Sequence, residues 1–197
     1  MNLTNAKNHF NKIHTHRKWV RHYGKMMGLR KWQAWTHDLS KYSPTEFLES
    51  VKYYQGDKSP IDACKAENGY SMAWFHHKGR NPHHYEYWQD NFDFGGTPVM
   101  MPYKYAVELL CDYLAAGRAY MEDKFTYKAE LEWWYKKRQN CAMHLQTKWF
   151  VSLVLQDLWE QERDGVSNIM IGSVNLYVFW NTAVSMWDQR RPIEYDT

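Results

Sequence analysis

The chain has 197 residues, a formal net charge of +3 and an aromatic content of 17%, with eleven Trp and fifteen Tyr. This length fits one domain that can bury a large core, and the charged residues are too evenly spread for a disordered chain. The small, dispersed charge argues against a nucleic-acid polymer as partner, although it is compatible with a local basic pocket for a phosphate.

The cysteines and the N-terminus bear on the compartment. The three cysteines lack CxxC spacing, so a disulfide framework or a zinc–thiolate site is not expected: Cys64, Cys111 and Cys141. The first ten residues lack the apolar core of a signal peptide, and no uncharged run reaches the roughly 20 residues of a membrane span. We therefore expect a cytoplasmic protein of a bacterial cell or an infecting phage, with no membrane partner.

The first predicted helix covers residues 4–27. Apolar residues recur there at steps of three and four, from Phe10 to Met27, and His16 falls on the same face. His16 is therefore expected to point inward, either as a buried structural histidine or as a ligand. Three other histidines lie off that face and are expected to be solvated: His9, His14 and His22.

A second helix is predicted after Gly28, and it ends in the pair His37-Asp38. An imidazole and a carboxylate at adjacent helical positions can hold one metal ion while the carboxylate bridges to a second. The next segment, Ser43 to Glu46, combines an N-cap serine, a proline at the first helical position and a glutamate placed to close a capping box. It predicts a third helix that ends near Gln55.

Four further histidines follow within nine residues. Residues 59–69 give no clear pattern, whereas residues 70–78 predict a helix that ends in His76-His77. Asn81-Pro82 then predicts a new helix with His83 and His84 in its first turn. Adjacent helical residues point about 100 degrees apart, so one histidine of each pair should face a shared site. We select His77 and His84 for that position.

The helix predicted over residues 102–122 carries Asp112 on its apolar stripe. A buried carboxylate needs a cation or a hydrogen-bonding partner, because its desolvation costs several kcal/mol on the order of the ionic penalty. A metal ion is one such partner, and a buried salt bridge to Arg118 or Lys104 is the alternative. With the histidines upstream, a metal site is the interpretation that accounts for most of these residues.

Two amphipathic helices, predicted over residues 127–139 and 144–162, are expected to pack, and His144 is expected to be structural. Residues 169–187 match helix and strand patterns about equally. The sequence thus predicts an all-α bundle, with a metal-binding domain over residues 1–163 and an extension of unknown role over 164–197. It contains no phosphate-binding glycine motif and no GxSxG elbow, which excludes P-loop and α/β-hydrolase proteins.

The order of these residues along successive helices resembles the HD superfamily, whose members are mostly metal-dependent phosphohydrolases of all-α fold: His16, His37-Asp38, His77, His83-His84, Asp112. Three segments also resemble a family of phage and bacterial proteins of unknown function. They are residues 35–46 (WTHDLSKYSPTE), 70–88 (YSMAWFHHKGRNPHHYEYW) and 101–120 (MPYKYAVELLCDYLAAGRAY). This second resemblance covers about residues 5–160.

The HD resemblance implies a first metal bound by His16, His37, Asp38 and Asp112, with Asp38 bridging to a second ion held by His77, His83 and His84. The ions would be two divalent metals such as Mn, Fe, Mg or Zn. His37 to Lys41 also resembles the HDxGK motif of cyclic-dinucleotide phosphodiesterases, although Ser40 replaces the glycine and their GYP motif is missing. A cation would hold the phosphate, and three residues are candidates: Lys41, Lys78 and Arg80.

Three functions remain open from the sequence. The first is a phosphohydrolase that acts on a nucleotide or another small phosphoester through metal-activated water, with Asp38 and Lys41 as catalytic residues. The second is an HD-type di-iron oxygenase, because histidine and carboxylate ligands also suit iron. The third is a non-catalytic protein that binds a host factor or a signalling nucleotide, in which the metal is structural or absent. The many aromatic residues suit such an interface and would also suit a homo-oligomer.

Overall fold

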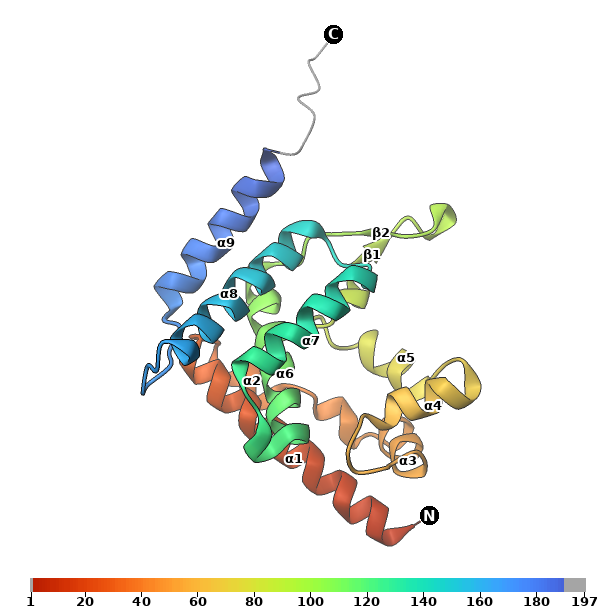
Figure 1. The fold of residues 1–197 in the computed structure, drawn as a ribbon. Coiled ribbons are helices and arrows are strands. Elements are labelled where there is room, and N and C mark those ends of the chain that lie inside the picture. Colours follow the sequence, from red (N-terminus) through yellow and green to blue (C-terminus); the bar gives the residue numbers. More distant parts are fainter. Residues whose placement is uncertain (1, 190–197) are drawn as a thin grey trace.

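The computed structural model describes residues 2–189 and consists mainly of helices joined by loops (Figure 1). Within this range the only strands are a two-residue pair, β1 (Gln89–Asp90) with β2 (Thr97–Pro98), so the predicted all-α class is confirmed. The α-helices are α1 (Leu3–Met26), α2 (Lys31–Thr36), α3 (Pro44–Lys52), α4 (Pro60–Asn68), α5 (Met72–Lys78), α6 (Tyr103–Met121), α7 (Tyr127–Asn140), α8 (Leu145–Arg163) and α9 (Ser173–Asp188). Short 3₁₀ helices cover Leu39–Tyr42, Tyr85–Tyr87, Phe92–Phe94 and Glu122–Lys124.

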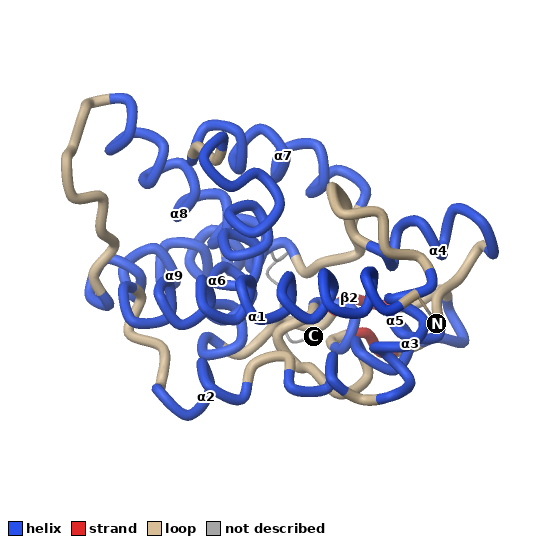
Figure 2. Tube along the Cα trace, turned by 90° about the horizontal axis from the view of Figure 1, so that it is seen from below, coloured by secondary structure: helices blue, strands red, loops and turns tan. Residues whose placement is uncertain are grey.

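Helix α6 is the central element of the fold. It runs alongside α1, and its side chains join those of α7, α8 and α9 in one hydrophobic cluster (Figures 1 and 2). The consecutive residues Leu109, Leu110 and Cys111 are all fully buried, so α6 is enclosed around most of its circumference. Two acidic residues of α6, Glu108 and Asp112, are buried as well, and they must therefore find their partners inside the protein.

At the N-terminal end of α1 the buried face is shifted by one residue from the predicted face. His9 is 7% exposed, whereas Phe10 is 48% exposed, so the prediction that His9 is solvated is wrong. The physical reason is the packing of α3, whose residue Phe47 meets the His9 ring at 5.3 Å between centroids. Further along, His16 lies on the buried face, as predicted, and there α1 contacts α6.

Helices α3, α4 and α5 gather at one end of the molecule (Figure 1). Ser43 caps α3 as predicted, and the unassigned segment 59–69 forms α4, which ends at Gly69 in the left-handed region with φ 79°. Glu49 of α3 accepts hydrogen bonds from the backbone N–H groups of Met72 and Ala73. This contact satisfies donors at the N-terminus of α5 and fixes α5 against α3.

The helix predicted to start at Asn81-Pro82 does not form. Residues 82–84 make a turn before the 3₁₀ helix Tyr85–Tyr87. The Asn81 side-chain amide donates to the His77 carbonyl at 2.8 Å and to Ser40 Oγ at 2.9 Å, which holds the side chain against the end of α5 and the 3₁₀ helix Leu39–Tyr42. The carbonyl of Pro82 accepts from the Trp88 indole, which holds the turn from its other side.

The segment that matched helix and strand patterns equally forms α9. Its residues Leu176, Trp180 and Ala183 are buried in the same hydrophobic cluster as α6 and α8. The division at residue 163 stays a prediction, and the part of the proposed extension from 190 to 197 lies outside the described residues. No helix in the described part of the chain combines the length and the apolar character that crossing a membrane requires.

Candidate metal centre

Asp38 lies in the turn between α2 and the 3₁₀ helix Leu39–Tyr42, and not within a helix as predicted. Its backbone is in the left-handed region with φ 56°, a conformation that aspartate tolerates better than most residues. Arg17 of α1 holds this turn by donating to the His37 carbonyl at 2.9 Å and to the Trp35 carbonyl at 2.6 Å. The Asp38 side chain is thereby fully buried.

A first cluster joins His16 of α1, His37, Asp38 and Asp112 of α6, whose ligand atoms all lie within 4.8 Å of one another. Asp38 Oδ2 lies 3.4 Å from His16 Nε2 and 3.3 Å from His37 Nε2. Asp112 Oδ1 lies 3.1 Å from His16 Nε2. The structure thus brings together the four residues assigned to the first metal, and Asp112 does not pair with Arg118 or Lys104.

A second cluster uses the other oxygen of the same carboxylate. Asp38 Oδ1 lies 3.2 Å from His77 Nε2 and 3.3 Å from His83 Nε2, and His84 completes the group. Both His83 and His84 are buried and face the centre, whereas the helical spacing had placed only one of them there. The turn that replaces the predicted helix allows this arrangement. Asp38 therefore lies between two clusters and offers one oxygen to each.

The centre contains buried polar atoms that no hydrogen bond satisfies. Within the described residues they include Asp38 Oδ1 and the Nε2 atoms of His77, His83 and His84, whereas Asp38 Oδ2 contacts the Lys41 ammonium group. Each unsatisfied group costs about 1–3 kcal/mol, so placing four together destabilises the fold unless something binds them. All four are lone-pair donors to a divalent cation when the imidazoles are neutral. The residues present therefore fit a metal centre.

Glu108 supports both clusters from outside. Its Oε1 lies 2.9 Å from His37 Nδ1 and 3.3 Å from His83 Nδ1, while the Gln33 side-chain amide donates to Oε2. A carboxylate that binds Nδ1–H fixes the imidazole tautomer and directs Nε2 toward the metal. The grouping of His37, His83 and Glu108 is therefore the outer side of the two clusters and not a third site.

Glu46 has the same role for the second cluster. Its two oxygens lie 2.6 Å from His76 Nδ1 and 2.7 Å from His77 Nδ1, so it orients the imidazoles instead of closing the capping box predicted from the sequence. Ser40 Oγ also contacts His77 Nδ1, at 3.1 Å. His76 is partly exposed and supports the centre from the side, whereas His77 faces it.

Two carboxylates and one imidazole of the centre are in the protonation states of metal ligands. Burial acts to raise the pKa of Asp38, but the charges of His37 and Lys41 hold it well below its usual range. Burial also opposes ionisation of Asp112, yet hydrogen bonds from His16 and His37 keep its pKa well below the usual range. For His84, burial and then repulsion from His83 lower the pKa far below normal, which leaves a neutral ring. Ionised carboxylates and a neutral imidazole are the forms that bind metals. Burial acts to lower the pKa of His37 and of His77, but the negative charge of Asp38 raises both, so these two rings release a proton when they bind a metal.

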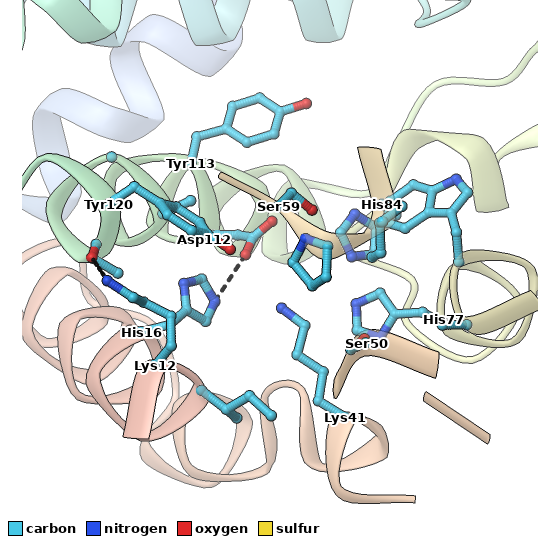
Figure 3. Close-up of a pocket in the computed structure, with 18 of the residues that line it drawn as sticks. Lys12, His16, Lys41, Ser50, Ser59, His77, His84, Asp112, Tyr113 and Tyr120 are labelled. Atoms are coloured by element: carbon cyan, nitrogen blue, oxygen red, sulfur yellow. Dashed lines mark hydrogen bonds and ion pairs between the residues drawn. The ribbon is translucent and has the colours of Figure 1, made fainter. Parts of the chain in front are cut away.

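A cavity of about 400 Å³ opens beside both clusters, a size suited to a small molecule. Lys41, His16, His77, His84 and Asp112 point toward its metal end from different elements (Figure 3). Away from the clusters, its lining includes two carboxyl groups and several aromatic rings: Glu86, Glu130, Tyr85, Tyr113, Tyr120 and Trp133.

Of the three cations predicted to bind phosphate, Lys41 lines this cavity. Its ammonium group contacts Asp38 Oδ2 at 2.5 Å. Lys78 and Arg80 are not among the described residues that line it, and the Lys78 ammonium lies instead 5.9 Å from the centre of the Phe75 ring. Lys12 of α1 lines the cavity and was missed, because its position on a surface-facing part of the helical pattern gave no signal.

Three acidic residues of the site were also missed. Glu108 precedes Asp112 by four residues on α6, which is the spacing of one helical face, so this signal was present in the sequence. Glu46 had an alternative explanation as a capping residue, and Glu130 lies in a helix that the sequence indicated only as a packing element. His144, expected to be structural, caps α8 through its side chain, away from the residues that line the cavity.

Comparison with known proteins gives a family and no reaction. Residues 5–157 match a family of unknown function, DUF5662, and the chain belongs to that family. No curated protein and no solved structure matches the chain. The matched range includes every residue of both clusters together with Glu46, Glu108 and Glu130, and it ends within α8, before α9.

Proposed function

We propose that this DUF5662 protein is a metal-dependent phosphohydrolase that acts on a nucleotide or another small phosphoester, with two divalent ions bound on either side of Asp38. The observation that carries the proposal is the Asp38 carboxylate, fully buried, with Oδ2 facing His16 and His37 and Oδ1 facing His77 and His83. A carboxylate shared in this way is typical of two-metal hydrolytic sites.

Each cluster would hold one ion. His16, His37, Asp38 and Asp112 would hold the first, and Asp38, His77, His83 and His84 the second. Ions bound there would lower the pKa of a water molecule and neutralise phosphoryl oxygens. Glu108 and Glu46 keep the imidazole Nε2 atoms directed inward, so that the binding geometry exists before the ions arrive.

The cavity supplies the remaining requirements of a phosphoester site. The Lys41 side chain is partly exposed to it, and an ammonium group there can contact a phosphoryl oxygen while staying near Asp38. The aromatic lining suits a nucleoside or another planar leaving group. The resemblance to the HD superfamily supports the same reaction. The proposed location is the cytoplasm of a bacterial cell, where the protein is encoded by the bacterium or by an infecting phage.

One observation favours a second candidate, a di-iron oxygenase. The second cluster contains three imidazoles and only the shared carboxylate, and a nitrogen-rich set prefers iron or zinc to magnesium. Phosphate release with manganese would identify the hydrolase, whereas dioxygen consumption with ferrous iron would identify the oxygenase.

Two variants test the proposed hydrolase. Asp38→Ala should lower both the metal content and hydrolysis of a nucleotide and phosphodiester panel, the latter by roughly a hundredfold or more. Lys41→Ala should keep its metal near the wild-type level and lose hydrolysis only. If wild-type protein carries no metal and hydrolyses nothing, while Asp38→Ala folds and behaves identically, the enzyme proposal fails and a binding protein for a host factor or a nucleotide takes its place.

A further inference from the structure

We propose that Glu130 is the general acid of this reaction and donates a proton to the leaving-group oxygen of the phosphoester. The inference rests on the proposed phosphohydrolase function and adds a residue that lies outside both metal clusters. Glu130 belongs to α7, which contributes none of the clustered histidines and aspartates, and it lines the cavity shared with His16 and Asp112.

The Glu130 carboxyl is buried without a partner. Its residue is 4% exposed, and no hydrogen bond or ion pair reaches the carboxyl from the described residues 2–189. By contrast, the carboxylates of Glu46 and Glu108 are also buried but each contacts two imidazoles. An unpaired carboxyl on the wall of a cavity has its hydrogen-bonding capacity available for a bound molecule.

The neighbouring helix has a gap in its surface that accommodates this carboxyl. A Cβ atom at Gly117 of α6 would lie 2.3 Å from Glu130 Oε2 and 2.7 Å from Phe125 Cε2. Gly117 has ordinary helical geometry, so the glycine is required for space and not for backbone conformation. A glycine inside a helix destabilises it by roughly 0.5–1 kcal/mol relative to alanine. A carboxyl without a protein partner and a glycine inside a helix therefore occur side by side, and the glycine leaves room for the carboxyl.

The position suits a leaving group and not a metal ligand. Gly117 follows Asp112 by five residues, which is about 7.5 Å along the axis of α6. The cavity that the clusters face is lined as well by Glu130, Tyr120 and Trp133. We place the phosphoryl group at the clusters and the rest of the substrate in this part of the cavity, with its ester oxygen toward Glu130.

The protonation state of Glu130 agrees with this role. In the metal-free protein, burial, and then the negative charge of Asp112, raise the pKa of Glu130 to about 8, so the carboxyl is neutral there at pH 7. A neutral carboxyl is the form that donates a proton. Besides the cluster residues His16, His77, His84 and Asp112, other titratable groups face the same cavity: His9 and Lys12 of α1, Lys41 of the 3₁₀ helix Leu39–Tyr42, Glu46 of α3, Tyr85 and Glu86, Tyr113 and Tyr120 of α6, and Lys137 of α7. The cations among them favour the ionised product of the transfer.

The oxygen of a water molecule forms a bond to phosphorus, and the bond from phosphorus to the ester oxygen breaks. The electron pair of the broken bond stays on the ester oxygen, which takes the proton of Glu130 and leaves as an alcohol. The water releases one proton to solvent, and the Glu130 carboxylate later regains one from solvent. No oxidant or reductant is needed.

The test compares leaving groups in the full-length protein loaded with manganese. An alkyl phosphate needs protonation of its leaving oxygen, whereas p-nitrophenyl phosphate does not. Glu130→Gln keeps the size of the side chain and should lower kcat/KM for the alkyl ester by roughly 10²–10⁴-fold, while p-nitrophenyl phosphate hydrolysis changes only a few-fold. Glu132→Gln, an exposed residue on the same helix, should leave both rates unchanged.

A second readout does not depend on activity. In metal-free protein labelled with ¹³C at glutamate carboxyls, one signal should titrate near pH 8 and be missing in Glu130→Gln. If wild-type protein hydrolyses both esters but Glu130→Gln slows them equally, or slows neither, the assignment of Glu130 is wrong and the phosphohydrolase stands. If wild-type protein hydrolyses neither ester and nothing in the nucleotide and phosphodiester panel, the proposed function fails and the assignment fails with it.

Discussion

Asp112 and Glu130 are two carboxyl groups on the wall of one cavity, and their surroundings move their pKa values in opposite directions. Burial opposes ionisation at both sites. Asp112 overcomes it because His16 and His37 donate hydrogen bonds, whereas Glu130 packs against Gly117 and the Phe125 ring and receives none within the described residues. The pKa of Asp112 therefore falls well below its usual range, and that of Glu130 rises to about 8.

The difference shows how one cavity can contain both a carboxylate that binds cations and a carboxyl that donates a proton. An ionised carboxylate binds cations, and a neutral carboxyl donates protons, although the functional group is the same. The histidines create the distinction, since they gather around Asp38 and Asp112 and stay away from α7. Substitutions that alter the surroundings of either carboxyl group should therefore alter its pKa or its chemical role.

The largest effect is expected from removing the ionised member. Asp112→Ala deletes one ligand of the first cluster, so hydrolysis should fall by roughly a hundredfold or more. The same change removes the negative charge that adds to the raised pKa of Glu130, which should then titrate at lower pH in the metal-free protein. Kinetics and ¹³C titration measure the two results, and wild-type rates in Asp112→Ala would contradict the assignment of the first cluster.

A second prediction concerns stability against pH in metal-free protein. The pKa of Glu130 is about 8 in the folded chain and 4.5 as its reference value, so its favourable contribution is complete below pH 4.5 and is lost as pH rises toward 8. The loss should approach about 1.4 kcal/mol per pH unit within that window. Urea unfolding of wild-type protein and Glu130→Gln should therefore diverge with pH, Glu130→Gln being relatively more stable at pH 8. Parallel curves would show that Glu130 ionises normally.

A smaller effect is expected at the outer carboxylate. In Glu108→Gln the side chain is neutral and keeps only one oxygen that can accept a hydrogen bond from His37 or His83. The two imidazoles are then held less well, so metal affinity should fall about 10–100-fold. Calorimetric titration with manganese measures this change, with Glu132→Gln as the control on an exposed surface. Unchanged affinity would mean that the imidazoles are oriented without Glu108.

The smallest predicted effect is at the gap in α6. Gly117→Ala places a methyl group against Glu130 and Phe125, and overpacking of this kind costs about 1–3 kcal/mol, offset by up to about 1 kcal/mol of helix propensity. A net loss on the order of 1 kcal/mol should appear in thermal unfolding. Gly79→Ala is the matched control, because its nearest contact would be an ordinary 3.4 Å. Equal stability of Gly117→Ala and Gly79→Ala would show that close packing does not require a glycine at position 117.

The helical periodicity predicted much of the framework. The apolar stripes of α1 and α6 placed His16 and Asp112 on inward faces, because a long helix with one buried side shows its orientation in the sequence alone. The segment that forms α9 was ambiguous, since its local pattern suits a strand as well. There the decision depends on burial of Leu176 and Trp180 against the rest of the core, which no local pattern contains.

The candidate centre was predictable in its residue types and less so in its geometry. The left-handed turn at Asp38 depends on Arg17, twenty-one residues earlier, and the turn at His83 depends on the hydrogen bonds of Asn81 to Ser40 and to the His77 carbonyl. Such contacts between distant segments override local helix signals. Glu130 was missed for a similar reason, because its neighbours Gly117 and Phe125 come from other elements.

If Asp38 holds two ions at once, the metal content of each chain should show it. Protein loaded with manganese and freed of excess should contain about two ions per chain by elemental analysis. Asp38→Ala should lose both, because each cluster loses its shared oxygen, whereas Lys41→Ala should keep both. Wild-type protein that binds no metal, or Asp38→Ala that retains two ions, would contradict the account.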